Sequence, residues 1–519
     1  MKINKHAKMK NKMNKTMKFL SMAALALVGA VMTGCSNDDI MDIDQPGNDN
    51  IERLTVVANL DGSTTRALSP LGAKTYAEGD QIAVIYTNTS DETKVAVSDA
   101  LTDGDITGEG KSAKFTVTLV NPKKSEAVTY IYPAYMAKED GSVNEEALYK
   151  EQDGTLETLG KKFDYCTYTD NWNDGKLPTA TLENQLFVCE FTLKYSDASI
   201  NDKVTAMTIS DDVDHNYYVN VDRTSSEADD PIYVAIRPTA SNDINYTAIA
   251  DGKVYTKSVT NKTYAAGTMR PIHLNMVQNN ELVPGLFSIG ASKKAYFAKG
   301  NLQLTAADTW AFATNQWEYF GTSQSDNHRD LFGWGTGNNP NQTSTSNGSY
   351  SSFTDWGNNT NLQSQLGTSW RTLTQAEWTY LFNTRTASSV NDTPYARYAK
   401  AKVNNVQGVI LFPDTYTHPA GVTAPTGINA TGNAGWNGND YDATAWGKME
   451  SAGCVFLPAA GRRNGSSVEN VGSYGYYWSS TAAGPAFAYG VNFSSGYLLA
   501  GGIFDHYYGF SVRLVRPVE

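Results

Sequence analysis

Apolar and polar residues alternate in short runs through the first half of the chain, over residues 53–277. In one run, Phe115, Val117 and Leu119 alternate with Thr116 and Thr118, which places the apolar side chains on one face of a strand. Runs of this kind predict strands at residues 54–60, 81–86, 114–120, 128–132, 186–193, 204–209, 231–238 and 271–276. Helical periodicity is nearly absent, so the pattern predicts an all-β antiparallel sandwich region in two lobes, with a boundary near residues 165–180.

A dipeptide turn supports antiparallel pairing near the end of this region. Asp251-Gly252 separates two strand-like runs, residues 246–250 and 253–258. Asp-Gly suits the positive φ angles of a two-residue hairpin turn, so the two runs are predicted to pair. Residues 278–285 contain paired asparagines and Pro284-Gly285, and are interpreted as a linker.

The remaining residues, 286–519, mix helical and strand patterns and predict a separate α+β domain. Its clearest helix lies within residues 370–382, where Thr374 as N-cap and Glu377 three residues later form a capping box. Trp378, Leu381 and Phe382 would share the buried face of this helix. A second helix is predicted near residues 441–452, strands at 286–289, 295–304, 407–413 and 454–458, and a polar loop at 338–361.

The first 34 residues have the pattern of a signal peptide. Residues 1–18 are rich in Lys and contain no acid, residues 19–32 are apolar, and Thr33-Gly34-Cys35 follows. The apolar run is too short for a comfortable membrane span. The Gly-Cys ending resembles a bacterial lipobox, which implies that Cys35 becomes the acylated first residue of a surface-displayed outer membrane lipoprotein. An ordinary secretory signal with an incidental Cys is the alternative.

The net charge of the chain without its signal peptide argues against two kinds of binding partner. Loss of residues 1–34 removes seven of the 42 Lys and Arg and none of the 54 Asp and Glu, so 35 basic and 54 acidic side chains remain, a net charge of −19. Such a chain is poorly suited to nucleic acid or to electrostatic attachment at an anionic membrane. Acyl chains at Cys35 would hold it at the membrane instead, with residues 35–52 as an acidic tether.

The sequence contains none of the common signatures of catalysis or metal binding. The six His residues are scattered, and there is no H-E-x-x-H, C-x-x-C, G-x-S-x-G or Walker motif. Cys189 and Cys454 lie in apolar runs and are interpreted as core residues. The sequence does not decide whether Cys166 and Cys189 form a disulfide. We therefore predict no catalytic residue, metal or cofactor. A glycan-active enzyme would need two placed carboxylates, which nothing in the sequence favours.

The last residues, 472–519, have an unusual composition. No charged side chain occurs between Ala482 and Phe504, a stretch of Tyr, Phe, Ser, Gly, Ala and a few aliphatic residues. Tyr, Ser, Gly and Asn are typical of binding loops, whereas residues 510–514 alternate like a core strand. The tail is interpreted either as a displayed binding surface or as a Gly-rich hairpin that closes a core.

A second feature of the tail is a gap in its residue types. Between Trp478 and Arg513 the chain lacks Lys, Glu, Gln, Met and Trp, the five types that an AAC codon cannot reach when its adenines are replaced. Together with this gap, four motifs give the region 286–519 a resemblance to the C-type-lectin-fold domains of the formylglycine-generating-enzyme-like group. These motifs are WRTLTQAEWTYLFNTR, GCVFLPAAGRRNG, GSYGYYWSST and GFSVRLVRPV. In particular, the region resembles the variable proteins of diversity-generating retroelements.

This resemblance implies a ligand-binding domain whose solvent-facing tail residues vary. The side chains expected on one exposed face are Tyr474, Tyr476, Phe487, Tyr489, Val491, Tyr497, Leu499, Phe504, Asp505, His506, Tyr507 and Tyr508. Trp478, Phe510, Val512 and Leu514 are expected to be buried. The motif Trp436-Asn437-Gly438-Asn439-Asp440 resembles a lectin calcium site only superficially, so calcium is not expected.

Residues 53–277 resemble the fimbrillins, the pilins and pilus-associated lipoproteins of Bacteroides-like bacteria. The residues that carry this resemblance are TTRA at 64–67, AEGDQI at 77–82 and AAG at 265–267 before the strand that contains His273. It implies that a trypsin-like protease cuts after Arg66 and that removal of the first strand opens a groove for the donor strand of another pilin. An accessory or tip subunit that is not cut is the alternative.

Three functional hypotheses follow from the sequence. The favoured one is a non-enzymatic surface adhesin or receptor lipoprotein, pilus-associated or tip-like, that binds an unknown protein or glycan through its C-terminal face. The alternatives are a structural fimbrial subunit without a dedicated ligand and, third, a glycan-active enzyme.

Overall fold

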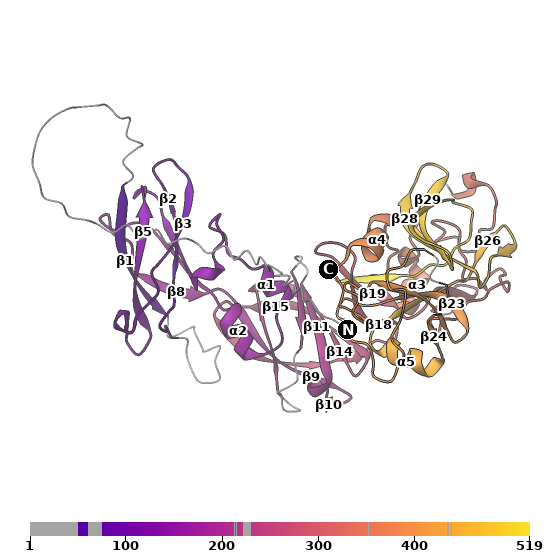
Figure 1. Ribbon diagram of the computed structural model, residues 1–519, viewed down its shortest axis with the longest axis horizontal. Coiled ribbons are helices and arrows are strands. Elements are labelled where there is room, and N and C mark those ends of the chain that lie inside the picture. The colour runs from indigo at the N-terminus through magenta and orange to yellow at the C-terminus, as the bar shows by residue number, and fades with distance from the viewer. Residues whose placement is uncertain are drawn as a thin grey trace, which may run out of the picture. The chain divides into compact units, whose positions relative to one another are not determined.

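The computed structural model describes residues 50–60, 75–211, 213, 215–221, 230–350, 352–432, 435–436 and 438–518 (Figure 1). Cys35 and Arg66 therefore lie outside the described residues, and the lipid-attachment and processing predictions stay predictions. Within the described ranges, no helix is long and apolar enough to cross a membrane. Most elements are β-strands, which group into several separate sheets.

Residues 51–184 form one eight-stranded sheet in the order β3-β2-β6-β7-β8-β1-β5-β4. The first strand, β1, lies inside this sheet, antiparallel to β5 and parallel to β8. The strands are β1 (Ile51–Leu60), β2 (Ala83–Thr87), β3 (Thr93–Val97), β4 (Ile106–Thr107), β5 (Ser112–Val120), β6 (Val128–Tyr132), β7 (Cys166–Asp170) and β8 (Ala180–Asn184). The short helices are η1 (Asp103–Asp105), η2 (Ala134–Met136), α1 (Glu146–Lys150) and α2 (Leu156–Lys162).

Residues 187–278 form two further sheets, ordered β10-β9-β13, with β16 parallel to β9, and β12-β11-β14-β15-β17. The strands are β9 (Phe187–Tyr195), β10 (Ala198–Ser199), β11 (Val204–Asp211), β12 (Asn216–Asn220), β13 (Ile232–Ile236), β14 (Thr239–Ala250), β15 (Lys253–Tyr264), β16 (Thr268–Asn275) and β17 (Val277–Gln278), with η3 (Asn201–Lys203) before β11. Asp251 and Gly252 join β14 to β15 with φ angles of 54° and 68°, which confirms the predicted hairpin.

Two details of this half differ from the sequence interpretation. The change of sheet falls between Asn184 and Phe187, a few residues beyond the 165–180 interval. Cys166 and Cys189 are both buried and no disulfide joins them, which decides the question that the sequence left undecided. Each thiol fills a place in a strand instead, as a small apolar residue does.

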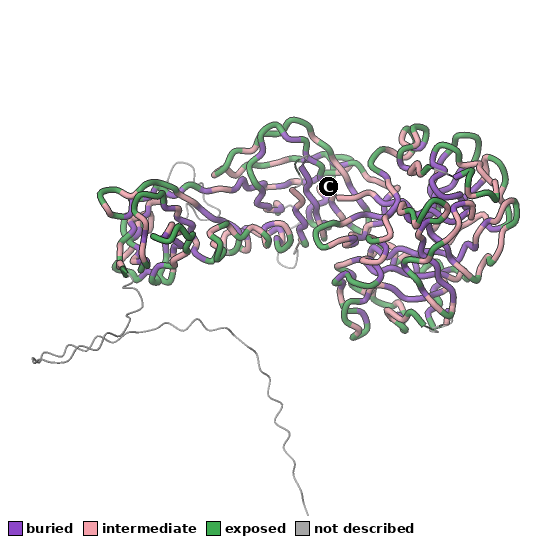
Figure 2. Tube along the Cα trace, turned by 90° about the horizontal axis from the view of Figure 1, so that it is seen from above, coloured by how far each residue is buried: buried purple, intermediate pink, exposed green. Residues whose placement is uncertain are grey.

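The C-terminal residues form small sheets ordered β18-β19-β31, β20-β21, β24-β22-β23-β25, β26-β27 and β28-β29-β30. The strands are β18 (Leu282–Ser288), β19 (Lys294–Ala298), β20 (Leu302–Ala306), β21 (Thr309–Phe312), β22 (Tyr398–Val403), β23 (Val406–Leu411), β24 (Asp440–Tyr441), β25 (Val455–Pro458), β26 (Arg462–Asn464), β27 (Ser467–Glu469), β28 (Tyr474–Ala482), β29 (Phe487–Ser494), β30 (Leu498–Asp505) and β31 (Val515–Val518). Figure 2 shows that buried residues concentrate in the interior of this region and exposed residues along its outer margin.

Half of the predicted linker, residues 278–285, belongs to strand β18. The register between β18 and β19 shifts between Leu282 and Leu286, and Pro284, which has no N–H to donate, lies inside this irregularity. Gly285 packs directly on backbone, because a Cβ there would lie 2.2 Å from the carbonyl oxygen of Gly453. Pro-Gly therefore marks a bulge and a close approach rather than a free connection.

The helices of the C-terminal region include the one that the sequence predicted best. They are α3 (Thr360–Leu366), α4 (Gln375–Thr379), the π-helical turn η6 (Tyr380–Thr384) and α5 (Ala443–Ser451), with 3₁₀ turns η4 (Asn347–Tyr350) and η5 (Trp356–Asn358). In α4, the Thr374 hydroxyl accepts from the Glu377 N–H and the Glu377 carboxylate accepts from the Thr374 N–H, which confirms the capping box. Trp378 is fully buried in the core that α4 shares with β29.

Two predicted strands take a different form. Residues 295–304 split into β19 and β20, because Gly300 lies against Ala313, whose carbonyl oxygen would be 2.4 Å from an added Cβ. Residues 510–514 are buried as predicted but make only isolated bridges, Phe510 with Phe332 and Ser511 with Tyr477. Regular pairing resumes only at β31.

Candidate ligand-binding face

The tail forms a three-stranded antiparallel sheet with β29 in the centre. Strand β28 pairs with β29 from Tyr474 opposite Ser494, and β29 pairs with β30 from Phe487 opposite Asp505. Register shifts interrupt both pairings, after Trp478 and after Gly490. The shift after Gly490 places one extra residue on β30, which reverses the face to which the following side chains point and interrupts the two-residue periodicity of the tail.

The predicted tail residues divide by exposure. Phe487 and Leu499 are 43% and 53% exposed, and Ile503, which the sequence analysis did not single out, is 56% exposed. Seven more are half-buried: Tyr474, Tyr489, Tyr497, Phe504, Asp505, Tyr507 and Tyr508. The buried expectations are confirmed for Trp478, Phe510, Val512 and Leu514.

Three of the predicted tail residues are buried, and their assignment to the exposed face is wrong. Val491 lies on the central strand and packs into the core that contains Tyr477 and Trp378. Tyr476 is 5% exposed because its ring stacks on Phe510 at 5.0 Å. His506 is 2% exposed and stacks on Trp334 at 4.2 Å, and burial lowers the pKa of its imidazole.

The half-buried rings form one continuous aromatic cluster. Tyr474 contacts Tyr497 at 6.2 Å, and Tyr508 stacks parallel to Phe510 at 6.2 Å. Phe504 meets Phe510 edge to face at 5.0 Å. We call Tyr474, Tyr497, Phe504 and Tyr508 the aromatic face. Partly exposed rings over a buried aromatic floor can present a large contact area at little conformational cost.

A charged residue that the sequence analysis missed borders the aromatic face. The Arg462 guanidinium lies 4.3 Å from the Tyr508 ring centroid and 5.7 Å from that of Tyr476. Its Nε and Nη2 atoms donate hydrogen bonds to Glu469 Oε2 at 3.1 and 3.0 Å. Arg462 follows β25 by only a few residues, but its place beside the tail depends on the folded arrangement. Arg462 opens the short strand β26, and no local pattern in the sequence marks its contact with the tail.

Polar contacts fix two other edges of the aromatic face. Asn347 in η4 donates to Asp505 Oδ1 at 2.7 Å, so the loop predicted at 338–361 reaches the end of β30. Asn492 donates to the Tyr497 hydroxyl at 2.7 Å. These contacts set the positions of Asp505 and Tyr497 before any ligand arrives, which lowers the cost of ordering them on binding.

A buried lysine holds the turn between β29 and β30. Lys400 on β22 is 1% exposed, and its ammonium donates to the carbonyl oxygens of Gly432 at 2.7 Å and Ser495 at 3.0 Å. Burial lowers the pKa of this ammonium. The side chain therefore joins the loop around residue 432 to the turn that carries Tyr497.

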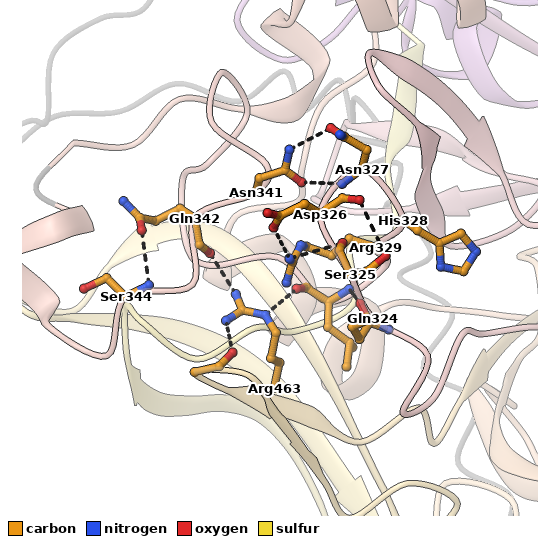
Figure 3. A network of polar contacts seen from close by, with 12 residues as sticks. Gln324, Ser325, Asp326, Asn327, His328, Arg329, Asn341, Gln342, Ser344 and Arg463 are labelled. Atoms are coloured by element: carbon orange, nitrogen blue, oxygen red, sulfur yellow. Dashed lines mark hydrogen bonds and ion pairs between the residues drawn. The ribbon is translucent and has the colours of Figure 1, made fainter.

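Arg463, the residue after Arg462, belongs with Arg329 to a network of buried polar contacts (Figure 3). Arg463 is fully buried and donates to the carbonyl oxygens of Leu331, Gly465 and Gln342. Burial lowers its pKa to about 10. Arg329 donates to Ser325 at 3.3 Å. The three carbonyl oxygens occupy the nitrogens of Arg463, so this side chain joins the segments that contain Leu331 and Gln342 to β26.

The structure gives the lectin-like motif a structural role as well. Asn439 donates to the carbonyl oxygens of Lys400 and Thr426, both at 2.8 Å, and accepts from the Thr426 N–H. Its carboxamide is therefore occupied in joining β22 to a loop. Among the residues that the structure describes, no group of three or more His, Cys, Asp and Glu side chains could hold a metal ion.

Comparisons with known proteins give only distant likenesses. No protein-family model matches the chain, and no curated protein matches it. Among solved structures, a candidate cell adhesion protein from Bacteroides fragilis is 10% identical over 44% of this chain and 96% of that one, with a TM-score of 0.26. A fimbrial assembly protein from Parabacteroides distasonis is 7% identical over 48% and 96%, with a TM-score of 0.25.

A fimbrial protein from Bacteroides ovatus is 12% identical over 91% of this chain and 100% of that one, with a TM-score of 0.20. The similar chains are thus cell adhesion and fimbrial proteins of Bacteroides and a related genus. All three TM-scores lie below 0.5, so these likenesses do not by themselves assign a function to this chain.

Proposed function

We propose that the protein is a surface adhesin or receptor that binds its ligand through the aromatic face. In this proposal the chain is a pilus-associated or tip-like outer membrane lipoprotein anchored by acylated Cys35, and its lectin-like C-terminal domain presents a face that varies between sister copies. The protein has no catalytic role in this proposal.

The aromatic face is the observation that carries the proposal most directly. Four rings, Tyr474, Tyr497, Phe504 and Tyr508, remain partly exposed while their floor is fully packed. Exposed aromatic surface of this kind costs solubility unless it serves a contact. Tyr is also among the residue types that supply most binding energy at interfaces. A closed structural hairpin would have buried these rings.

The experiment compares adhesion of beads that carry residues 36–519 to bacterial and epithelial cell surfaces. Replacement of Tyr474, Tyr497 and Phe504 by Ala removes three neighbouring rings, each worth about 1–4 kcal/mol if it contacts ligand. We expect bead retention to fall at least about tenfold. The thermal midpoint is measured in parallel to show that the fold persists.

The matched control replaces exposed side chains elsewhere, Val97, Tyr135 and Tyr395, by Ala. These side chains are 47%, 56% and 53% exposed, so a similar area of apolar surface is lost. Retention should stay at the wild-type level. Equal retention of the aromatic-face variant, or no retention of wild-type beads on any surface, would leave the structural-subunit alternative.

The position of β1 favours a second role, as an acceptor of a donor strand from another pilin. Strand β1 pairs with β5 from Ile51 to Asn59 and with β8 from Ala58 to Leu60. It buries Val56, Ala58 and Leu60. Removal of β1 by cleavage after Arg66 would leave β5 and β8 with unpaired backbone and an apolar groove. An incoming strand could satisfy both.

Complementation by a peptide tests this second role. A chain that begins at Ala67 should lose about 4 kcal/mol of unfolding free energy, since Val56 and Leu60 each contribute roughly 1.5–3 kcal/mol by burial. A peptide of residues 51–60 added in trans should restore the thermal midpoint. The same peptide with Val56→Asp and Ala58→Asp is the control. An unchanged midpoint in the truncated chain, or no rescue, would contradict the acceptor role.

A further inference from the structure

Strand β30 forms an open edge of the tail sheet. Its pairing partner is β29, and no strand of the described residues pairs with its other side. Leu499, Gly501 and Ile503 are exposed along this strand. The remaining large apolar side chain exposed in the tail, Phe487, lies opposite the end of β30.

The register identifies which backbone groups of β30 face outward. The His506 N–H donates to the Ala486 carbonyl at 3.1 Å, which makes these two residues a hydrogen-bonded pair. Bonded and non-bonded pairs alternate along antiparallel strands. Three pairs further along, Tyr489 and Ile503 are therefore a non-bonded pair. The N–H and C=O of Ile503 point away from β29, and no described residue bonds them.

This edge lacks the features that usually protect an edge strand from a partner. Protected edges carry charged side chains, especially Lys, or Pro, or are covered by a loop. From Leu498 to Phe504 strand β30 has no charged side chain and no Pro; its one charged residue, Asp505, ends the strand and accepts from Asn347.

We propose that β30 binds an extended, largely uncharged peptide segment of a protein ligand by addition of a fourth strand to the tail sheet. This inference rests on the proposed ligand-binding function and assigns the ligand class, a polypeptide rather than a glycan. The row of outward N–H and C=O groups matches the repeat of another strand. The absence of charge along the edge matches uncharged side chains on the incoming segment, and Leu499 and Ile503 supply apolar contacts to them.

The test selects binders from a random 12-residue peptide library on immobilised residues 36–519, with a glycan array probed in parallel. Selected peptides should alternate apolar and polar residues and bind the wild-type chain. Ile503→Pro removes the outward N–H without breaking a bond to β29. It should raise the dissociation constant at least tenfold, whereas Ile503→Val should change it less than twofold.

A second arm places the change on the peptide, so the result does not depend on folding of the Pro variant. N-methylation of alternate peptide amides should abolish binding in one register and leave it intact in the other. Equal binding by both methylated sets, or selection of no peptide, would overturn the proposal. So would a binder that Ile503→Pro does not weaken while the variant keeps its thermal midpoint.

The outcomes also separate this inference from the proposed function. If the aromatic-face variant loses bead retention while Ile503→Pro retains it, the adhesin function stands and the added strand is wrong. Glycans that bind the wild-type chain and are lost with the aromatic face would lead to the same conclusion. A concentration-dependent dimer that Ile503→Pro abolishes, without peptide binding, would make the edge a contact between copies and also overturn the proposal.

Discussion

Replacement of Trp478 by Ala is expected to destabilise the C-terminal domain by about 3–5 kcal/mol. The indole is 1% exposed and stacks on Phe510 at 4.1 Å. Its Nε1 donates to the carbonyl of Phe332 at 2.7 Å. The substitution creates a large cavity and also removes one of the two hydrogen bonds to that carbonyl, which still accepts from the Phe510 N–H at 2.9 Å. Chemical unfolding followed by near-ultraviolet circular dichroism measures the change.

The control for this prediction is Tyr474→Ala, four residues earlier on the same strand. Tyr474 is half-buried and lies on the aromatic face, so its loss should cost less than about 1.5 kcal/mol of stability. The two variants therefore separate a packing position from a contact position within β28. Equal destabilisation would mean that the aromatic face is part of the core, which would contradict its proposed role.

Replacement of Arg463 by Met is expected to cost about 3–5 kcal/mol of unfolding free energy. The guanidinium is fully buried and its three nitrogens serve the carbonyl oxygens of Leu331, Gln342 and Gly465. Met fills much of the volume but donates no hydrogen bond, so the buried Leu331 carbonyl and the half-buried Gly465 carbonyl lose this donor. The Gln342 carbonyl keeps one donor, the Tyr350 hydroxyl at 3.3 Å. Because Leu331 and Gln342 lie in loops far from Arg463 in sequence, these loops should exchange their amide hydrogens faster.

The neighbouring residue supplies the matched control. Arg462 is partly exposed and pairs with Glu469 at 3.0 Å, and such pairs contribute about 0–1 kcal/mol. Arg462→Met should therefore change stability little, although it should weaken ligand binding if the guanidinium at the aromatic face contacts ligand. If the two Met variants were equally stable, the carbonyl network around Arg463 would not hold the loops.

The lipid anchor and the proteolytic step stay predictions from the sequence. Both depend on residues, Cys35 and Arg66, that the structure does not describe. They are linked, because cleavage after Arg66 would separate β1 and the acylated residue from the rest of the chain. The peptide complementation experiment is therefore informative for both anchoring and assembly.

Local sequence patterns determined the elements whose signals lie within a few residues. The strand at 128–132, the Asp251-Gly252 hairpin and the Thr374–Glu377 capping box all agree with the structure. In each case the physical cause is local: side-chain alternation, permitted φ angles, or a hydrogen bond between residues three apart. Burial of Trp478, Phe510, Val512 and Leu514 also follows from residue type, since they are large apolar side chains, whereas burial of Ser511 and Arg513 does not.

The tertiary structure alone decided which tail residues are displayed. Val491, Tyr476 and His506 have the same composition signal as their exposed neighbours, yet each is covered by a residue distant in sequence or by a second layer. The register shift between β29 and β30 lies beside Gly490 and Gly502, but these glycines alone do not fix the pairing that decides which neighbouring side chains face outward. The edge position of β30 and the approach of Arg462 likewise depend on long-range pairing, which short-range periodicity does not encode.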